Sequence, residues 1–365
     1  MAGATTRGGS RTAGYRFAEG LDGEALAEGL VIGALGDPRE AEKAVARFEL
    51  VMAAHGATGQ AARSIARECV GRALDRATAA ERLVAGDRGI VQRTPAWYEA
   101  RRGMVTGSEM RNALTATKAF LAKKARDARA AGEATGGGAG GSPARAEPTG
   151  ETATEFLARA AAEASASRSS PALEWGVMFE PVACALYERF RGVRVHEFGL
   201  MAHRDIQGFG ASPDGVTDAG VMLEIKCPYT RDPDGPIPEG YFWQMQAQME
   251  VLDLDACDFL QCVFELSGGR GGACEGGEDT GELESGGVAS DGEVVFGKDA
   301  TPEWLLAAES RGLKAWLWRL RKWDLRRVAR DRGFFEEIKP CLLETISKLE
   351  RQQEGERNDS RGEPR

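Results

Sequence analysis

The sequence contains no run of about 18 apolar residues, so a membrane-spanning helix is not expected. Its histidines, His55, His196 and His203, are too few and too scattered for a histidine-built metal centre. Its seven cysteines are odd in number and form no Cys-x-x-Cys pair, which argues against a disulfide framework or a zinc ribbon. We therefore expect an intracellular protein of a reducing compartment, with no membrane partner.

An excess of positive charge is also missing. The 47 Lys and Arg residues against 56 Asp and Glu residues give a net charge of −9, which by itself argues against a nucleic-acid partner. The charge is unevenly spread, because residues 271–297 hold seven acids and no basic residue, whereas residues 311–332 hold nine basic residues and two acids. Local charge governs the field at a site, so a nucleic-acid partner remains open.

The length of 365 residues allows one large domain with extensions, or two domains. Apolar residues at helical spacing predict helices over residues 38–84, inside an N-terminal extension of residues 1–90. A main domain is expected over residues 91–352. Two flexible insertions are predicted from their glycine-rich composition, one near residues 134–151 and one, which is also acidic, at residues 267–293. The polar residues 353–365 are predicted to form a disordered tail.

Residues 91–352 mix helical and strand patterns. The expected strands are residues 193–198, 208–211, 221–226, 259–266 and 294–296. Helices are expected from the Thr94-Pro95 start and over residues 117–132, 173–190, 241–252, 302–332 and 334–352. This pattern predicts an α/β (α+β) fold, with a mixed central sheet flanked by helices, a helical N-terminal extension and C-terminal helices.

Residues 314–332 interleave three tryptophans with basic side chains. As a helix, this stretch would pack its Trp and Leu residues on one face and follow DNA phosphates with the other. An ordinary amphipathic helix with a solvated basic face explains the pattern equally well. The same two interpretations apply to the basic residues 117–132.

The chemistry-bearing residues lie between Gly208 and Pro228. Asp214 occupies a Ser-Pro-Asp-Gly turn, and Glu224 and Lys226 follow on one face of an apolar strand. If the two segments form a hairpin, the two carboxylates converge, and such oxygen donors suit Mg²⁺ or Mn²⁺. A surface hairpin with an exposed Glu–Lys pair is the alternative, but charges inside an apolar strand are costly unless they are paired or bound to a metal.

The string Ser-Pro-Asp-Gly-(x)8-Glu-Ile-Lys-Cys-Pro resembles the active-site core of the PD-(D/E)XK nucleases, and more narrowly the lambda exonuclease and YqaJ-type viral recombinase family. The resemblance runs from about residue 94 to residue 264. It implies a restriction-endonuclease-like core in which Asp214, Glu224 and the Ile225 carbonyl hold a metal ion. In such a core, Lys226 positions or activates the attacking water.

Residues 97–108 are similar to the family's Trp-x-x-x-Arg-x-Gly-x-x-Thr-(Gly/Ala)-Ser segment. The resemblance implies that Arg101 and Ser108 bind a terminal DNA phosphate, that Ser212 faces the same phosphate, and that Arg231 does likewise. The spacing of Arg231 from the Lys-Cys-Pro segment is one residue shorter than in lambda exonuclease. A capping serine and a surface arginine are the alternative interpretation of the 97–108 motif taken alone.

Two helical motifs complete the resemblance. Residues 173–181 match the family's Trp-Gly-x-x-x-Glu helix, which implies that Glu180 lies close to the metal site and contributes to it. Residues 241–249 match its Tyr-x-x-Gln-x-Gln-x-x-Met helix, which implies that Gln244 reaches the active-site cleft. Gln248 shares that helix face, whereas Gln246 points elsewhere.

The resemblance implies a Mg²⁺-dependent DNA exonuclease, with Mn²⁺ as an alternative ion, that resects duplex ends 5′→3′ in recombination or in processing of viral-type genomes. Its implied partners are double-stranded DNA ends, a single-strand annealing protein and two further copies in a homotrimeric ring. The helical N-terminal extension would block or replace the ring contact. A structure-specific endonuclease or repair nuclease on the same core, and a catalytically silent DNA-binding recombination scaffold, are the alternatives.

Overall fold

The computed structural model describes residues 16–17, 21–32, 34–87, 90–115, 170–266 and 285–361. The helix expected over residues 117–132 and the insertion expected near residues 134–151 lie outside the described residues. Within these ranges, no helix has both the length and the apolar character needed to cross a membrane.

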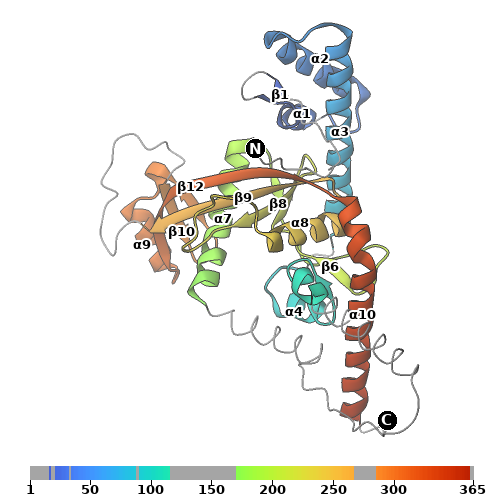
Figure 1. Ribbon diagram of the computed structural model, residues 1–365. Helices are drawn as coiled ribbons and strands as arrows, with labels where there is room; N and C mark the ends of the chain where they lie inside the picture. The colour runs from blue at the N-terminus through green and yellow to red at the C-terminus, as the bar shows by residue number, and fades with distance from the viewer. Residues whose placement is uncertain are drawn as a thin grey trace, which may run out of the picture.

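A seven-stranded mixed sheet forms the centre of the molecule (Figure 1). Its strand order is β11-β10-β12-β9-β8-β7-β4. Strands β8 and β9 are parallel and are connected through helix α8, as a parallel pair requires, whereas the other neighbours are antiparallel. The strands are β4 (Val195–His196), β7 (Gly215–Thr217), β8 (Met222–Lys226), β9 (Ala256–Leu266), β10 (Ser285–Ala289), β11 (Val294–Phe296) and β12 (Ala315–Ala329).

Helices cover both faces of this sheet. Leu223 and Ile225 of β8 pack with Phe179 of α7 (Pro171–Arg191) on one face. On the other face, Met222 packs with Met245 of α8 (Glu239–Leu252). Because both faces of the sheet are covered, β8 is buried along almost its whole length, and it carries the charged Glu224 and Lys226 among apolar residues. The predicted α/β fold, a mixed central sheet flanked by helices, is confirmed.

Short strands and an N-terminal helical unit surround the sheet. A second sheet has the order β3-β6-β5, and β1 pairs with β2. The N-terminal helices pack around their own core. Helix α3 also contacts the main domain closely: a Cβ added to Gly220 would lie 2.0 Å from the Arg76 carbonyl oxygen. These elements are α1 (Gly23–Val31), α2 (Pro38–Ala54), α3 (Gly59–Gly86), α4 (Pro95–Arg101), β1 (Arg16–Phe17), β2 (Leu21–Asp22), β3 (Val105–Thr106), β5 (Met201–Ala202) and β6 (Phe209–Ala211).

The helix predicted over residues 302–332 is wrong. Only α9 (Pro302–Ser310) is helical, and the basic, Trp-rich stretch forms strand β12. The backbone of β12 pairs with β9 along one edge and with β10 along the other, while Trp318 and Leu320 are buried in the core. This pairing across the sheet outweighs the local helical pattern, so the predicted amphipathic basic helix does not exist.

The insertion predicted over residues 267–293 is too long. Residues 285–289 form β10, and residues 267–284 lie outside the described residues. Gly286 and Gly287, which read as loop residues, lie where a Cβ would approach the Val295 carbonyl oxygen to 2.1 Å and the Trp304 ring to 2.4 Å. Glycine here permits close packing inside a sheet.

Of the other C-terminal predictions, one strand and the start of the last helix are present, whereas the helix extends into the predicted tail. The expected strand at residues 294–296 is present as β11. Helix α10 (Arg332–Arg361) begins where a C-terminal helix was expected and extends to the end of the molecule opposite α1 and α2 (Figure 1). Residues 353–361, assigned to a tail from the sequence, continue this helix.

The position of Trp318 provides a test of the β12 assignment. Its side chain is completely buried (0% exposed) between Phe264 and Phe296. Trp318→Ala is expected to lower the free energy of unfolding by about 3–5 kcal/mol, measured by urea denaturation. Leu306→Ala, which removes a large apolar group that is 64% exposed, is the control and should change it by about 0.5 kcal/mol at most. Equal effects would contradict the assignment.

Candidate active site

The β7–β8 hairpin brings the two predicted carboxylates to one end of the sheet. Gly215 pairs with Leu223, so Asp214, immediately before β7, lies beside Glu224. The Asp214 Oδ2 atom accepts a hydrogen bond of 2.6 Å from the Ile225 amide. The turn signature and the alternation of β8 therefore produce the convergence that the sequence implied.

Glu224 is completely buried, and its two oxygens differ. Oε1 forms an ion pair with the Lys226 ammonium, whereas Oε2 is buried with no hydrogen-bond partner among the described residues. Leaving a buried polar atom unsatisfied costs about 1–3 kcal/mol, and more for a charged group. Such an orphaned carboxylate oxygen is suited to a ligand that supplies positive charge.

Burial, followed by the charge of Glu224, raises the pKa of Asp214 well above its usual range, although Lys226 acts in the opposite direction. Burial alone would lower the pKa of Lys226, but the charges of Glu224 and Asp214 outweigh it and raise that pKa. The Lys226 ammonium is therefore held in its charged form. It is a single positive charge beside the two carboxyl groups of Asp214 and Glu224.

These donors fit a hard divalent cation. Asp214 and Glu224 offer carboxylate oxygens, one of them orphaned, and the site contains no thiolate or imidazole among them. Among the residues that the structure describes, no group of three or more His, Cys, Asp or Glu side chains has the spacing of a metal site. Backbone carbonyl oxygens and water would complete the shell, as is usual for Mg²⁺.

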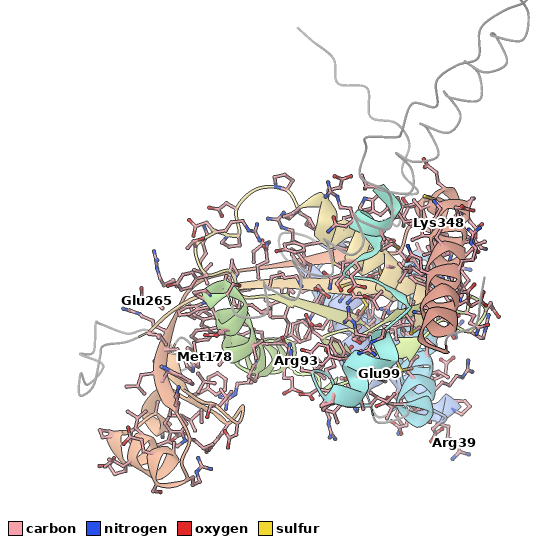
Figure 2. The ribbon with its side chains drawn as sticks, turned by 90° about the horizontal axis from the view of Figure 1, so that it is seen from below. Arg39, Arg93, Glu99, Met178, Glu265 and Lys348 are labelled. Atoms are coloured by element: carbon pink, nitrogen blue, oxygen red, sulfur yellow. The ribbon has the colours of Figure 1, made fainter. Side chains whose placement is uncertain are left out.

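Glu180 of α7 enters this end of the sheet together with a residue that the sequence did not reveal. Glu180 Oε2 is paired with the Arg93 guanidinium. Figure 2 shows Arg93 between α7, which carries Met178, and α4, which carries Glu99. Arg93 has a left-handed backbone (φ 63°), which costs a residue with a Cβ about 1–2 kcal/mol. No motif marks Arg93, and an arginine before a Thr-Pro helix start reads as an ordinary loop residue.

The predicted phosphate-binding residues lie together around Trp97. Arg101 Nη2 donates to Ser108 Oγ at 3.2 Å and to Thr106 Oγ1 at 2.7 Å. Its guanidinium lies 4.2 Å from the Trp97 ring centre, and Trp97 Nε1 donates to Ser212 Oγ at 2.9 Å. The structure therefore joins Arg101, Ser108 and Ser212 into one cluster, with two hydroxyls and a guanidinium that suit an anion.

The α8 glutamines take different places. Gln248 Nε2 donates weakly to the Ser212 carbonyl oxygen at 3.4 Å, and its Oε1 is buried without a partner among the described residues. Gln246 binds the Ala329 carbonyl oxygen and fastens α8 to the end of β12, so it points away from Gln248, as expected. The Gln244 side chain makes no hydrogen bond to a described residue, so its role stays a prediction.

Arg231 is not joined to the phosphate cluster. Arg231 Nη2 donates to Gln261 Oε1 at 2.7 Å, and its guanidinium lies 5.8 Å from the Tyr241 ring centre. The Lys226 ammonium lies 5.2 Å from the same ring. Arg231 and Lys226 thus both lie near the Tyr241 ring, a neighbourhood that the sequence did not indicate.

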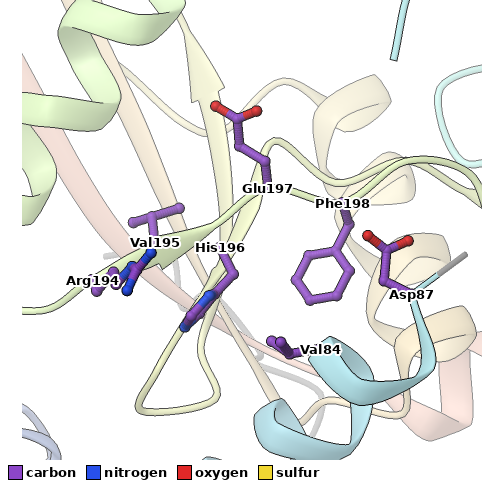
Figure 3. A pocket seen from close by; sticks show the side chains of 7 residues that line it. All are labelled: Val84, Asp87, Arg194, Val195, His196, Glu197 and Phe198. Atoms are coloured by element: carbon purple, nitrogen blue, oxygen red, sulfur yellow. The ribbon is translucent and has the colours of Figure 1, made fainter. Parts of the chain in front are cut away.

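A hollow of about 310 Å³ lies at the C-terminal end of α3, outside this constellation. Val84 and Asp87 of the α3 end face Arg194–Phe198 across it (Figure 3). None of its lining residues belongs to the predicted site. The carboxylate end of the hairpin therefore remains the candidate active site.

Comparison with known proteins supports the motif resemblance. Residues 96–255 match the family model of the YqaJ-like viral recombinase domain, so the predicted resemblance to that family is confirmed. An uncharacterized protein of Acanthamoeba polyphaga mimivirus is 37% identical over an alignment of 108 residues, which covers 25% of this chain and 20% of that protein. The match thus spans about one fifth of the length of that relative.

Two solved structures are also similar to this chain. The alkaline exonuclease of Laribacter hongkongensis is 21% identical, with a TM-score of 0.42, over 74% of this chain and 99% of that chain. A phage-related exonuclease from Haemophilus somnus 129PT is 15% identical, with a TM-score of 0.33, over 60% of this chain and 91% of that chain.

Asp214→Asn is expected to stabilise the ion-free protein at alkaline pH. Folding raises the pKa of Asp214, so protonation of this carboxyl stabilises the folded protein. The stabilisation is complete below the ordinary carboxyl pKa of about 4 and is lost as pH rises through the raised value. Asparagine carries no charge and keeps an acceptor for the Ile225 amide. In EDTA at about pH 8, Tm should rise by at least about 2 °C, and the gain should shrink toward pH 4. A lower Tm at pH 8 would contradict the unfavourable ionisation.

Proposed function

Because residues 96–255 match the YqaJ-like viral recombinase domain, we propose that this protein is a Mg²⁺-dependent DNA exonuclease that resects duplex ends 5′→3′. The observation that carries the proposal is the completely buried Glu224, with one oxygen unpartnered, beside Asp214 and Lys226. A module that only bound DNA would gain nothing from this costly arrangement.

Asp214 and Glu224 would hold the ion with the Ile225 carbonyl. Glu180, which is paired with Arg93 in the ion-free protein, would become a further ligand once that pair opens. When bound, such an ion supplies charge stabilisation to the phosphoryl oxygens and lowers the pKa of water. Lys226, kept charged by its two acidic neighbours, donates hydrogen bonds that orient the attacking water and the scissile phosphate. Gln244 supports the cleft from α8.

The cluster of Arg101, Ser108 and Ser212 supports the proposed polarity. Ser212 and Asp214 are two residues apart, so a terminal phosphate at Ser212 would lie next to the carboxylates. A 5′-phosphate anchored there places the first internucleotide linkage of that strand at the catalytic end of the hairpin. The exonuclease would therefore remove nucleotides from the 5′ end.

The biological partners remain predictions. Double-stranded DNA ends are the proposed substrate, in recombination or in processing of viral-type genomes. A homotrimeric ring and a single-strand annealing protein follow from the motif resemblance, and the domain organisation, with residues 1–90 as an extension of a nuclease domain over 91–352, is part of the same proposal. Light scattering of the full chain measures the oligomeric state directly.

Asp214→Ala is expected to abolish digestion, because it removes one carboxylate ligand and leaves Glu224 alone. The assay is digestion of linear duplex labelled at each 5′ or 3′ end in turn, with Mg²⁺ against EDTA. Turnover should fall by at least about 100-fold, while duplex binding in EDTA should change little. Asp205→Ala removes an exposed carboxylate and is the control. Retained digestion by Asp214→Ala, or equal cutting of circular DNA by the wild type, would count against the proposal.

Arg101→Gln is expected to remove the preference for a 5′-phosphate. A hydrogen bond to a charged group contributes about 1.5–3 kcal/mol, so digestion of phosphorylated duplex should fall about 10- to 100-fold, while that of unphosphorylated duplex changes little. Arg102→Gln is the matched control, because Arg102 is 74% exposed and pairs with Glu99. Equal losses on both substrates would mean that Arg101 serves the fold and not the phosphate.

A further inference from the structure

Residues 90–93 enter the catalytic end of the sheet from outside the matched family domain, which begins at residue 96. An added Cβ on Gly199 would meet the Ile90 carbonyl oxygen at 1.6 Å, so the two backbones are in close contact. Gln92 Nε2 donates to the carbonyl oxygens of Phe198 and Pro213, each at 2.8 Å. Since Pro213 precedes Asp214, these bonds fix the next residue, Arg93, beside the carboxylates.

Arg93 combines three properties that a structural ion pair does not need together. Its backbone is left-handed although it is not a glycine. Its guanidinium pairs with Glu180, and the charge of Asp214 also acts on it. Its side chain is 42% exposed, so an incoming group can approach it from solvent. Strained positions of this kind cluster at active sites.

The charge balance of the site indicates what Arg93 would meet. Asp214, Glu224 and Glu180 bring three negative charges, against Lys226 and Arg93. The Lys226 ammonium is paired with Glu224, which would remain a ligand of the ion, and Arg101 bonds to Ser108 beside Trp97. A divalent ion that bound Glu180 would compete with Arg93 for this carboxylate. Among the described residues of the site, Arg93 is therefore the cation that the ion would release.

We propose that Arg93 is a catalytic residue whose guanidinium moves from Glu180 to a non-bridging oxygen of the scissile phosphate. This inference rests on the proposed exonuclease function. The fork of guanidinium donors matches phosphate geometry and neutralises charge that builds up on the phosphoryl oxygens. The family match does not assign this role, because Arg93 lies before its first residue.

The left-handed backbone makes a clean variant available. Glycine adopts this conformation without strain, so Arg93→Gly removes the guanidinium and relieves the backbone together. Arg93→Lys keeps the charge but loses the fork. Arg204→Gly is the control, because Arg204 is 84% exposed and pairs only with neighbouring Asp205 among the described residues.

The test measures kcat and KM on 5′-phosphorylated, end-labelled duplex with Mg²⁺, Tm in EDTA, and rescue by millimolar guanidinium ion. Arg93→Gly is expected to lower kcat roughly 100-fold, with KM changed less than about threefold, Tm at or above that of the wild type, and kcat partly restored by guanidinium. Arg93→Lys should fall between these two proteins, and Arg204→Gly should match the wild type.

Two results would overturn the role of Arg93. One is a kcat of Arg93→Gly within about threefold of the wild type. The other is a loss of activity with a lower Tm and no rescue by guanidinium, which would make Arg93 a structural tie to α7. Both leave the exonuclease proposal intact when the wild type digests the duplex. A wild type that digests nothing refutes the proposed function, and the role of Arg93 with it.

Discussion

The site depends on burying the Glu224 carboxylate at the centre of a sheet that is apolar on both faces. A charge in this position is unfavourable unless it is paired, and Lys226 satisfies only one of its two oxygens. Burial, and then the charge of Glu224, raises the pKa of the neighbouring Asp214 carboxyl. The ion-free site thus lacks positive charge, which a divalent cation would supply.

Glu28 is a second buried acid, and both of its carboxylate oxygens are paired. Glu28 of α1 is paired with Arg76 of α3, Arg191 of α7 and Arg327 of β12. Both of its oxygens have partners, so this network ties the N-terminal helices to the sheet and leaves nothing for a ligand. Glu224 differs, because one of its oxygens has no partner among the described residues and stays available to a ligand.

The sequence predicted those parts of the protein whose signals are local. The β7–β8 hairpin follows from a turn signature and an alternating strand, and the Trp97–Ser108 segment follows from a contiguous motif. Strand β12 was missed because its conformation is imposed by β9 and β10 on its two edges. Gly286 has the signature of a loop, and only the close approach of Val295 explains its place in a strand. Arg93 had no signal, because a left-handed backbone leaves no mark on an arginine.

The two halves of the site share one short stretch of chain, and this favours an enzyme that works at ends. Ser212, bonded to Trp97, and Asp214, bonded to the Ile225 amide, are at most about 7 Å apart at Cα. Both residues belong to the short connection between β6, which ends at Ala211, and β7, which begins at Gly215. A strand whose terminal phosphate occupied the Ser212 cluster would present its first linkages to the carboxylates. An internal linkage, which has chain on both sides, would have to place nucleotides where we propose that the cluster of Arg101 and Ser108 binds a terminus.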